Sequence, residues 1–322
     1  MKKIKSVLPF FINVEAVTVF SICSKEVAES VKQSLKLCYT SVIPSLLPFF
    51  ILCDFLMHLS IGIDAPANIT AFVGGLITGF PTGVKNVCTL YTNGNLDRKS
   101  ATALLHCTAN ASPAYIISFI GICIIHNKNA GIILFISQCI CALVCAFFFG
   151  CFKKQNKRYG KAVSITESLC LALSESVKSC LNVCGYIIFF GIFADLLMIS
   201  GITNGLPNEL SAIIIGAIEI SRGLSLIEFK SQYAIVAASV ILAFSGISVI
   251  MQCIGCTVRS GLSVKAIIGG KLAYIVLMPA VSYLLYSLKN YLAFVVSLVF
   301  IFLCALILYI IFDKSKRRLY NK

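Results

Sequence analysis

The sequence predicts an all-α polytopic membrane protein: two inverted-topology repeats, each with a broken or re-entrant helix, around a central polar site. The 322 residues are 58% hydrophobic and 12% charged, with a mean hydropathy of +0.93. Apolar runs of the ~20 residues that cross a bilayer recur along the whole chain. Two of these runs are interrupted by glycine and charged residues, at 74–86 and 216–223. Interruptions in corresponding positions of two halves are typical of transporter sites at the bilayer midplane.

Ten apolar runs are candidate membrane segments. A β-barrel is excluded because the runs are continuously apolar instead of alternating. Two of them, 33–60 and 170–200, are longer than one crossing needs, so each is expected to include an amphipathic turn at the membrane interface. The ten runs are 7–23, 33–60, 69–91, 101–125, 130–151, 170–200, 209–228, 233–257, 266–288 and 291–313.

A central basic linker divides the chain. We expect an N-terminal transmembrane helix in 1–29, a first repeat in 30–152, a basic cytoplasmic linker in 153–165, a second repeat in 166–290, and a C-terminal transmembrane helix with a basic tail in 291–322. The first helix could instead be a cleaved signal peptide. Asn13 and Glu15 interrupt its apolar core, which favours a retained helix.

The net charge of +14 is explained by the membrane. The basic residues cluster in short segments between apolar runs, as they do in cytoplasmic loops of membrane proteins. We therefore predict the lipid bilayer as a partner and no nucleic acid. The expected location is the cell membrane, which the chain crosses several times.

Internal similarity indicates a duplication. At an offset of 141 residues, Asp54 coincides with Asp195 and Gly75 with Gly216. The offset then falls by about eight, the length of the loop 93–100 that the second half lacks. Apolar sequences also match by chance, but the paired aspartates and glycines favour a true repeat.

Parity fixes the relative direction of the two repeats. The basic linker and the basic tail should both be cytoplasmic, yet five segments lie between them. One of the five must therefore fail to cross, and the same holds between the basic N-terminus and the linker. Re-entrant segments at 69–91 and 209–228 resolve both conflicts, and the halves then enter the membrane from opposite sides. This argument requires helix 7–23 to span.

Glycine and proline supply the first break. Gly79 and Gly83 permit positive φ, and Pro81 removes a backbone donor. Backbone groups freed inside a membrane must be buried in protein or line a wet cavity, so we expect them to face a ligand. Lys85 follows within one turn and could hold a carboxylate or phosphate. Alternatively, its ammonium group extends to the membrane interface.

Charged residues mark the second break. Glu219 and Arg222 are three apart on one helical face and can pair. An isolated charge at this depth costs roughly 3 kcal/mol, so Lys85 is a second candidate partner for Glu219. Glu219 could bind a cation, accept a proton or hydrogen-bond a hydroxylated ligand. The alternative is a salt bridge that only stabilises the turn.

Polar islands at 108–113 and 244–252 follow the two breaks. Asn110 and Gln252 offer donors and acceptors without charge, which suits a polar neutral solute. Serine and threonine here could equally pack helices together. Asp54 and Asp195 lie near segment ends and could simply meet water. The predicted substrate-binding residues are Thr78, Gly79, Pro81, Gly83, Lys85, Asn86, Asn110, Ser112, Glu219, Ser221, Arg222, Ser245, Ser248 and Gln252.

Signatures of catalysis and metal binding are missing from the sequence. It has no nucleophile elbow, P-loop, zincin motif or dinucleotide fingerprint. Most of the sixteen cysteines lie in apolar runs, where a thiol packs as a small hydrophobic group, and the three histidines lack ligand spacing. We therefore predict no enzyme, no cofactor and no metal, and any transport would be secondary or passive.

Five ordered motifs resemble the sporulation integral membrane protein YlbJ family. The resemblance covers about residues 33–290 and departs mildly from the usual family pattern at Thr82, where alanine is usual, and at Ser221, where threonine is frequent. The family is grouped with the nucleoside-recognition or gate domain membrane proteins, so each repeat would be gate-like. The motifs lie at 41–50, 78–85, 108–113, 216–223 and 245–252.

The resemblance implies a role in the formation of resistant spores. Together with the broken segments, it predicts a secondary transporter or channel for a small polar solute, which could be nucleoside-like, an amino acid or a carboxylate. The alternative is a non-transporting assembly or signalling protein for maturation of the spore cortex or coat. The sequence does not identify the solute or a coupling cation or proton. It also does not indicate the direction of movement or the oligomeric state.

Overall fold

The computed structural model describes residues 2–60, 66–152, 164–229 and 232–288, and every regular element within them is helical. The expected C-terminal segment and tail (291–322) and nearly all of the basic linker lie outside the described residues. Five helices of the described part are long and apolar enough to cross a membrane. They are Ser24–Leu56, Lys128–Phe148, Ile165–Ile199, Tyr233–Ser260 and Val264–Ser287. The predicted class of helical, polytopic membrane protein is therefore confirmed.

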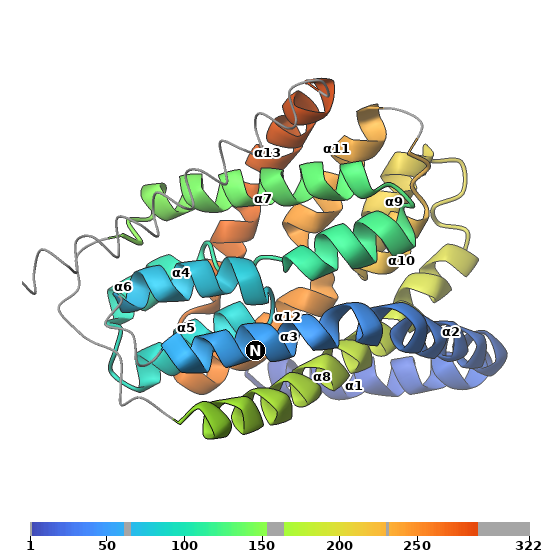
Figure 1. Cartoon of the computed structure of the whole chain (residues 1–322). Helices are drawn as coiled ribbons and strands as arrows, with labels where there is room; N and C mark the ends of the chain where they lie inside the picture. Colours follow the sequence, from blue (N-terminus) through green and yellow to red (C-terminus); the bar gives the residue numbers. More distant parts are fainter. Residues whose placement is uncertain (1, 61–65, 153–163, 230–231, 289–322) are drawn as a thin grey trace, which may run out of the picture.

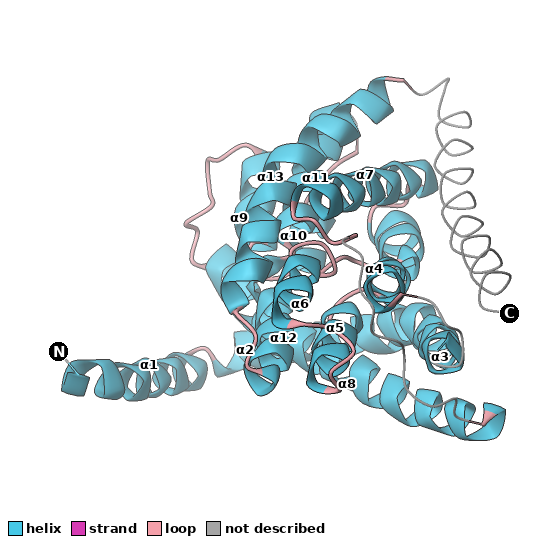
Figure 2. Ribbon diagram, turned by 90° about the vertical axis from the view of Figure 1, so that its left-hand side faces the viewer, coloured by secondary structure: helices cyan, strands magenta, loops and turns pink. Residues whose placement is uncertain are grey.

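One side of the molecule consists of the N-terminal helices and the long helix α8. Helix α2 (Ser24–Leu37) continues through the π-helical turn η1 (Cys38–Val42) into α3 (Ile43–Ser60), and α8 (Ile165–Ile199) packs against both α2 and α3 (Figure 1). Helix α1 (Lys2–Ile22) projects away from this body (Figure 2).

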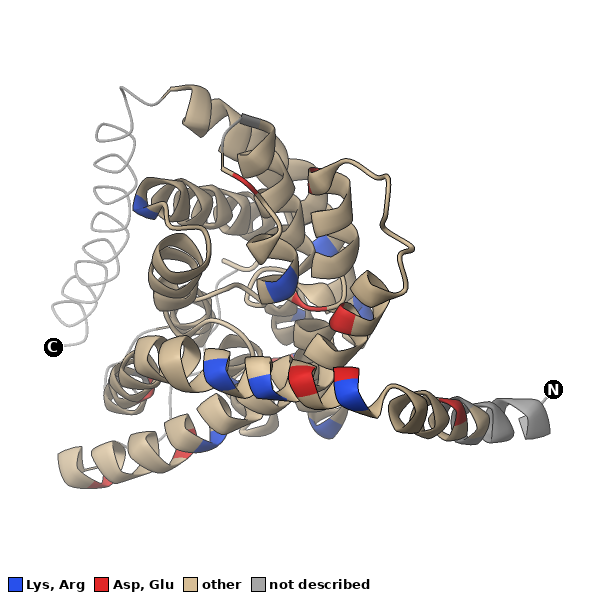
Figure 3. Ribbon diagram, turned by 90° about the vertical axis from the view of Figure 1, so that its right-hand side faces the viewer, with Lys and Arg blue, Asp and Glu red and all other residues tan. Residues whose placement is uncertain are grey.

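Helix α2 is amphipathic, and most of it precedes the predicted segment 33–60. Its acidic and basic side chains are exposed, whereas Ser30 and Ser34 are buried against α8. Figure 3 shows these charged residues along α2, while most of the ribbon carries none. The polar face of α2 therefore suits the membrane interface, and its serine face joins α8.

The opposite side is formed by three packed helices. Helix α13 (Val264–Ser287) contacts both α7 (Lys128–Phe148) and α11 (Gln232–Phe244). Their contact faces are rich in alanine, isoleucine and cysteine, and the buried thiols there are free, as expected for packing residues. Close packing of small and branched side chains is the usual source of helix association in lipid.

The predicted breaks lie between these two sides. Segment 69–91 divides into two helices at Gly79–Pro81, and segment 209–228 divides at 217–219, as the sequence predicts. Two further interruptions correct the prediction of continuous segments 101–125 and 233–257. The interior elements are α4 (Ala67–Thr78), α5 (Thr82–Thr92), α6 (Arg98–Leu105), η2 (Ala114–Ile124), α9 (Asn208–Gly216), α10 (Ile220–Ser225) and α12 (Gly246–Ser260).

The two extra interruptions have local causes. Segment 101–125 unwinds after α6, where Asn110 precedes the Ser112–Pro113 pair. In the second half, Ser245 and Gly246 both adopt positive φ, at 69° and 64°, which separates α11 from α12. A residue in this left-handed region cannot continue a right-handed helix.

Glycines let each broken segment fold back on itself. A Cβ atom added at Gly83 would lie 2.8 Å from the Cα of Gly75 and 2.7 Å from the carbonyl oxygen of Thr108. A Cβ atom at Gly223 would overlap the backbone of Gly216. Helices α4 and α5, and likewise α9 and α10, are therefore hairpins held at backbone contact.

We expect Gly83→Ala and Gly223→Ala each to lower the free energy of unfolding by about 1–3 kcal/mol, because the added methyl group overpacks a backbone contact. The matched control is Gly185→Ala, since a Cβ atom there meets nothing within 4 Å. The apparent melting temperature of the detergent-purified protein checks this. Equal melting temperatures for all three variants would contradict the hairpin contacts.

Candidate functional site

The first hairpin break is bonded to the unwound stretch after α6. Gly79 has φ 71° and ψ −174°, a conformation open almost only to glycine, and a Cβ atom there would collide with Ser112. The main-chain N–H of Phe80 donates to the carbonyl oxygen of Asn110 over 2.6 Å. Two interrupted backbones thus satisfy each other inside the protein, which is the condition for irregular structure at membrane depth.

Gln138 completes the hydrogen bonding of this unwound stretch. Its side-chain amide donates to the carbonyl oxygen of Ala111 (2.8 Å) and accepts from the N–H of the same residue (2.9 Å). Asn110 donates to the carbonyl oxygen of Cys107 over 2.6 Å, and Ser112 accepts from the N–H of Tyr115 over 3.2 Å. The predicted roles of Asn110 and Ser112 in solute binding stay predictions, while these contacts stabilise the loop.

The second hairpin break is bonded to the start of α12. The N–H of Ile247 donates to the carbonyl oxygen of Ala217 over 2.8 Å, and that of Ser248 to Ile218 over 3.2 Å. A Cβ atom at Gly246 would lie 3.1 Å from the carbonyl oxygen of Gly216. Each hairpin break therefore lies against the interruption of a neighbouring helical segment.

Lys271 connects the two interrupted regions, and the sequence analysis missed it. This lysine of α13 is buried, and its Nζ donates to the carbonyl oxygen of Ala109 (2.6 Å) and to the hydroxyl of Ser245 (2.5 Å). The rings of Phe80 and Tyr274 lie 6.0 and 5.9 Å from the same nitrogen. The signal was available, because a lone lysine within a predicted membrane segment is a functional candidate by default.

Three predicted or neighbouring site residues carry buried polar atoms without a hydrogen-bond partner in the described structure. They are the hydroxyl of Thr82, the side-chain nitrogen of Asn86 and the side-chain oxygen of Gln252. Thr82 and Asn86 are one turn apart on α5, and α5 packs against α12, which carries Gln252. Buried polar groups are usually paired, so unpaired ones at a helix interface are candidates for ligand contacts.

Glu219 is buried and begins the short helix α10. Its carboxylate accepts from the hydroxyl of Ser221 (2.5 Å) and from the main-chain N–H of Arg222 (2.9 Å). It is therefore an N-cap, the position where a carboxylate satisfies free backbone donors. Thr78 similarly uses its hydroxyl locally, donating to the carbonyl oxygen of Gly74 over 2.9 Å.

The predicted side-chain partners of the charged residues were wrong. The Arg222 guanidinium pairs with Asp195 over 3.0 Å, and not with Glu219. The Lys85 ammonium pairs with Glu175 over 2.5 Å, and not with Glu219. Both cations extend from their hairpins to α8, whereas the carboxylate of Glu219 caps the start of α10. The structure therefore separates Lys85 and Arg222 from the predicted common site.

Asp54 and Asp195 are partners of serines, instead of simply meeting water. Asp54 on α3 accepts from Ser176 on α8 over 2.8 Å, and Asp195 on α8 accepts from Ser30 on α2 over 2.5 Å. Arg222 adds a hydrogen bond of 3.0 Å to Ser34. Each aspartate thus joins a helix of the N-terminal side to α8.

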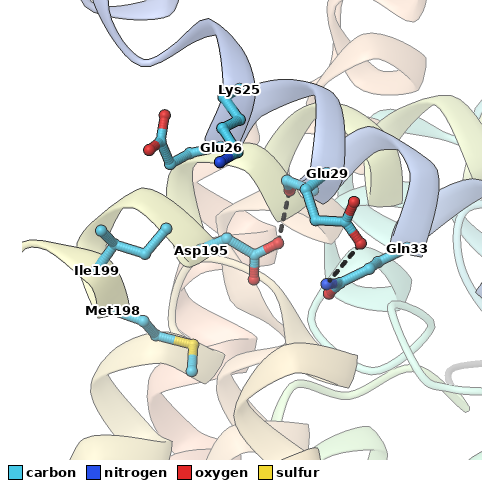
Figure 4. A pocket seen from close by; sticks show the side chains of 8 residues that line it. Lys25, Glu26, Glu29, Gln33, Asp195, Met198 and Ile199 are labelled. Atoms are coloured by element: carbon cyan, nitrogen blue, oxygen red, sulfur yellow. Dashed lines mark hydrogen bonds between the residues drawn. The ribbon is translucent and has the colours of Figure 1, made fainter.

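A pocket of about 380 Å³ opens beside Asp195, between α2 and α8. Figure 4 shows Asp195 directed into it, opposite Glu29 and Gln33 of α2, with Met198 on one wall. Ser30, which bonds Asp195, also lines the pocket. The pocket therefore has charged walls and ends near the Arg222–Asp195 ion pair.

The comparisons with known proteins agree with this architecture. No protein-family model and no solved structure matches the chain. The chain is 27% identical over 284 residues to the sporulation integral membrane protein YlbJ of Bacillus subtilis (strain 168), and the match covers 70% of this chain and 69% of that protein.

The long apolar helices and the buried, interrupted segments define a multi-pass integral membrane protein. Within that class, the chain is similar over most of its length to the sporulation integral membrane protein YlbJ, which supports membership of that family. The resemblance of the five sequence motifs is thereby confirmed.

We expect Lys271→Met to lower the free energy of unfolding by about 1–3 kcal/mol, because the carbonyl oxygen of Ala109 loses a buried donor. Lys265→Met, at the exposed start of the same helix, is the matched control and should leave stability unchanged. Thermal unfolding in detergent measures both. A Lys271→Met protein as stable as the control would show that the ammonium group does not join the two interrupted regions.

Proposed function

We propose that the protein is a secondary transporter or channel for a small polar solute, and that it acts in the formation of resistant spores. The observation that carries the proposal is the meeting of two interrupted regions at buried Lys271, between membrane-crossing helices. Unwound backbone at membrane depth occurs where protein or a water-filled path surrounds it, and such breaks form the solute sites of transporters.

Contacts that recur at corresponding positions of the two halves support this proposal, and we interpret them as the product of an internal duplication. At the offset of 141, the contact of Gly75 with Thr108 corresponds to that of Gly216 with Ile241, once the offset falls to 133 after the loop that the second half lacks. Related halves place their interruptions around a pseudo-two-fold axis, and inverted repeats of this kind are frequent in secondary transporters.

The same reduced offset of 133 relates further contacts. It relates Ser112 to Ser245, and Gln138 on α7 to Lys271 on α13. Gln138 bonds Ala111, beside Ser112, just as Lys271 bonds Ser245. Helices α7 and α13 would therefore be equivalent. The amide of Gln138 on α7 bonds one interruption, and the ammonium group of Lys271 on α13 bonds the corresponding one.

The solute site that we propose lies between α5 and α12. Thr82, Asn86 and Gln252 would supply hydrogen bonds to the solute through the atoms that lack protein partners, and Ser248 lies one turn before Gln252. Hydroxyl and amide groups can bind nucleoside-like molecules, amino acids or carboxylates. Glu219 would not contact the solute directly; by capping α10 it would stabilise the backbone of the second hairpin. No covalent chemistry is proposed, and no cofactor.

The sporulation role rests on the relative. The Bacillus subtilis protein is named a sporulation integral membrane protein, and the two chains share a quarter of their residues over most of their length. We therefore propose that this chain also acts during spore formation, in a membrane of the sporulating cell.

Ligand binding is tested by thermal stabilisation of the purified protein with nucleosides, amino acids, dicarboxylates and divalent cations. A ligand at a hundredfold excess over its dissociation constant should raise the free energy of unfolding by about 2.7 kcal/mol. Gln252→Ala should abolish the shift, because the side-chain amide no longer meets the solute. Glu209→Gln, on α9 and outside the proposed solute site, is the control and should retain the shift. No stabilisation by any ligand would favour the assembly or signalling role.

The sporulation role is tested in Bacillus subtilis that lacks its own YlbJ. Expression of this chain should raise the count of heat-resistant spores above that of the same strain carrying an empty vector. A Gly83→Ala, Gly223→Ala double variant, with both hairpins disrupted, is the negative control. Equal spore counts with and without the chain, at matched membrane levels, would contradict a shared role.

A further inference from the structure

Two ion pairs connect the broken hairpins to one helix, α8. Lys85 of α5 pairs with Glu175, and Arg222 of α10 pairs with Asp195. In each hairpin the cation stands on the second arm, and in each pair α8 supplies the carboxylate. Helix α8 therefore contacts both hairpins through a charge.

The two pairs lie far apart along α8. Glu175 and Asp195 are twenty residues apart on the continuous helix α8, which corresponds to about 30 Å along its axis. The hydrocarbon core of a bilayer is also about 30 Å thick. The pair Lys85–Glu175, here called the linker-side pair, is nearer to the basic linker that precedes α8. The pair Arg222–Asp195, here called the pocket-side pair, lies beside the pocket under α2.

The linker-side pair is open to the surroundings and has a second carboxylate beyond it. The Lys85 and Glu175 side chains are 41% and 38% exposed. Ser176, next to Glu175 on α8, donates to Asp54 on α3. Separation of Lys85 from Glu175 would release the second arm of the first hairpin from α8.

The pocket-side pair is more enclosed. The Arg222 and Asp195 side chains are 16% and 17% exposed, and Ser30 and Ser34 of α2 bond them from the other side. Asp195 also lines the pocket between α2 and α8. Arg222 follows Glu219 by three residues and donates its main-chain N–H to it, so movement of Arg222 would move the capped end of α10.

We propose that the linker-side pair and the pocket-side pair are the two gates of the solute path, opened one at a time. This inference rests on the proposed transport function. Each hairpin can leave α8 only when its pair separates, and the two pairs are about 30 Å apart along α8. With one pair closed and the other open, the interrupted regions around Lys271 would face one side of the membrane only.

Hydrogen–deuterium exchange of the full-length protein in lipid nanodiscs tests the gates without a known solute. Asp195→Asn should raise exchange in α2 and the last turns of α8 at least about threefold, because an ion pair there is lost, and should lower exchange in α5. Glu175→Gln should do the reverse. Glu167→Gln, an exposed carboxylate two turns earlier on α8, is the matched control and should change neither end.

A cross-link tests the pocket-side gate without removal of a charge. A Cβ atom at Gly191 on α8 would lie 2.9 Å from the hydroxyl oxygen of Ser34 on α2, the position that a cysteine sulfur would take there. The two Cβ atoms are then within reach of the ~3.8 Å that separates them in a disulfide. Oxidised Ser34→Cys, Gly191→Cys protein should show less exchange in α2 and at least about threefold more in α5 than its reduced form. Wild-type protein and the two single variants, oxidised in the same way, control for the native thiols.

Reciprocal changes at the two ends support the gates. Changes confined to the altered end, in both the charge variants and the cross-linked protein, would overturn them and leave the pairs as structural contacts. The ligand screen separates this inference from the proposed function. If a solute stabilises the protein but the exchange changes stay local, the proposed transport function holds and the two gates do not. Reciprocal exchange in a protein that binds no solute would leave a switching device that serves another purpose.

Discussion

The fold depends on the need to satisfy the backbone of interrupted helices inside the protein. Four helical segments of the described structure are broken, and every break frees N–H and C=O groups that lipid cannot bond. Backbone groups of one break bond those of another: the N–H of Phe80 donates to the carbonyl oxygen of Asn110, and the N–H of Ile247 donates to that of Ala217. Side chains complete the arrangement through Gln138 and Lys271. The position of each hairpin follows from these bonds.

Close approach of the backbones is the second condition. Hydrogen bonds between two loops require the hairpin arms to touch, and a side chain at the crossing would separate them. Glycine stands at both crossings for this reason, at Gly83 against Gly75 and at Gly223 against Gly216. The polar contacts and the glycine contacts therefore depend on each other, since the loss of either would hold the loops apart.

Much of the architecture could be predicted from the sequence because apolar length and helix-breaking residues are local signals. The breaks at Gly79–Pro81 and before Glu219 were found in this way. The charge partners could not be predicted, because helix α8 brings Glu175 and Asp195 to cations that are distant in sequence. Residues three apart on a helix, such as Glu219 and Arg222, look like partners in sequence, yet a carboxylate that caps its own helix is directed away from the following guanidinium.

Helix α8 also restricts how the two hairpins can move relative to it. Twenty residues at 3.6 per turn rotate the helix by about 200°, so Glu175 and Asp195 face nearly opposite directions. A tilt of α8 about its middle would therefore stretch both ion pairs together or shorten both together. A sideways displacement of α8 has the opposite effect on the two pairs, since it draws α8 away from one cation and toward the other. The geometry of this single rod thus favours translation over rocking as the motion that exchanges one contact for the other.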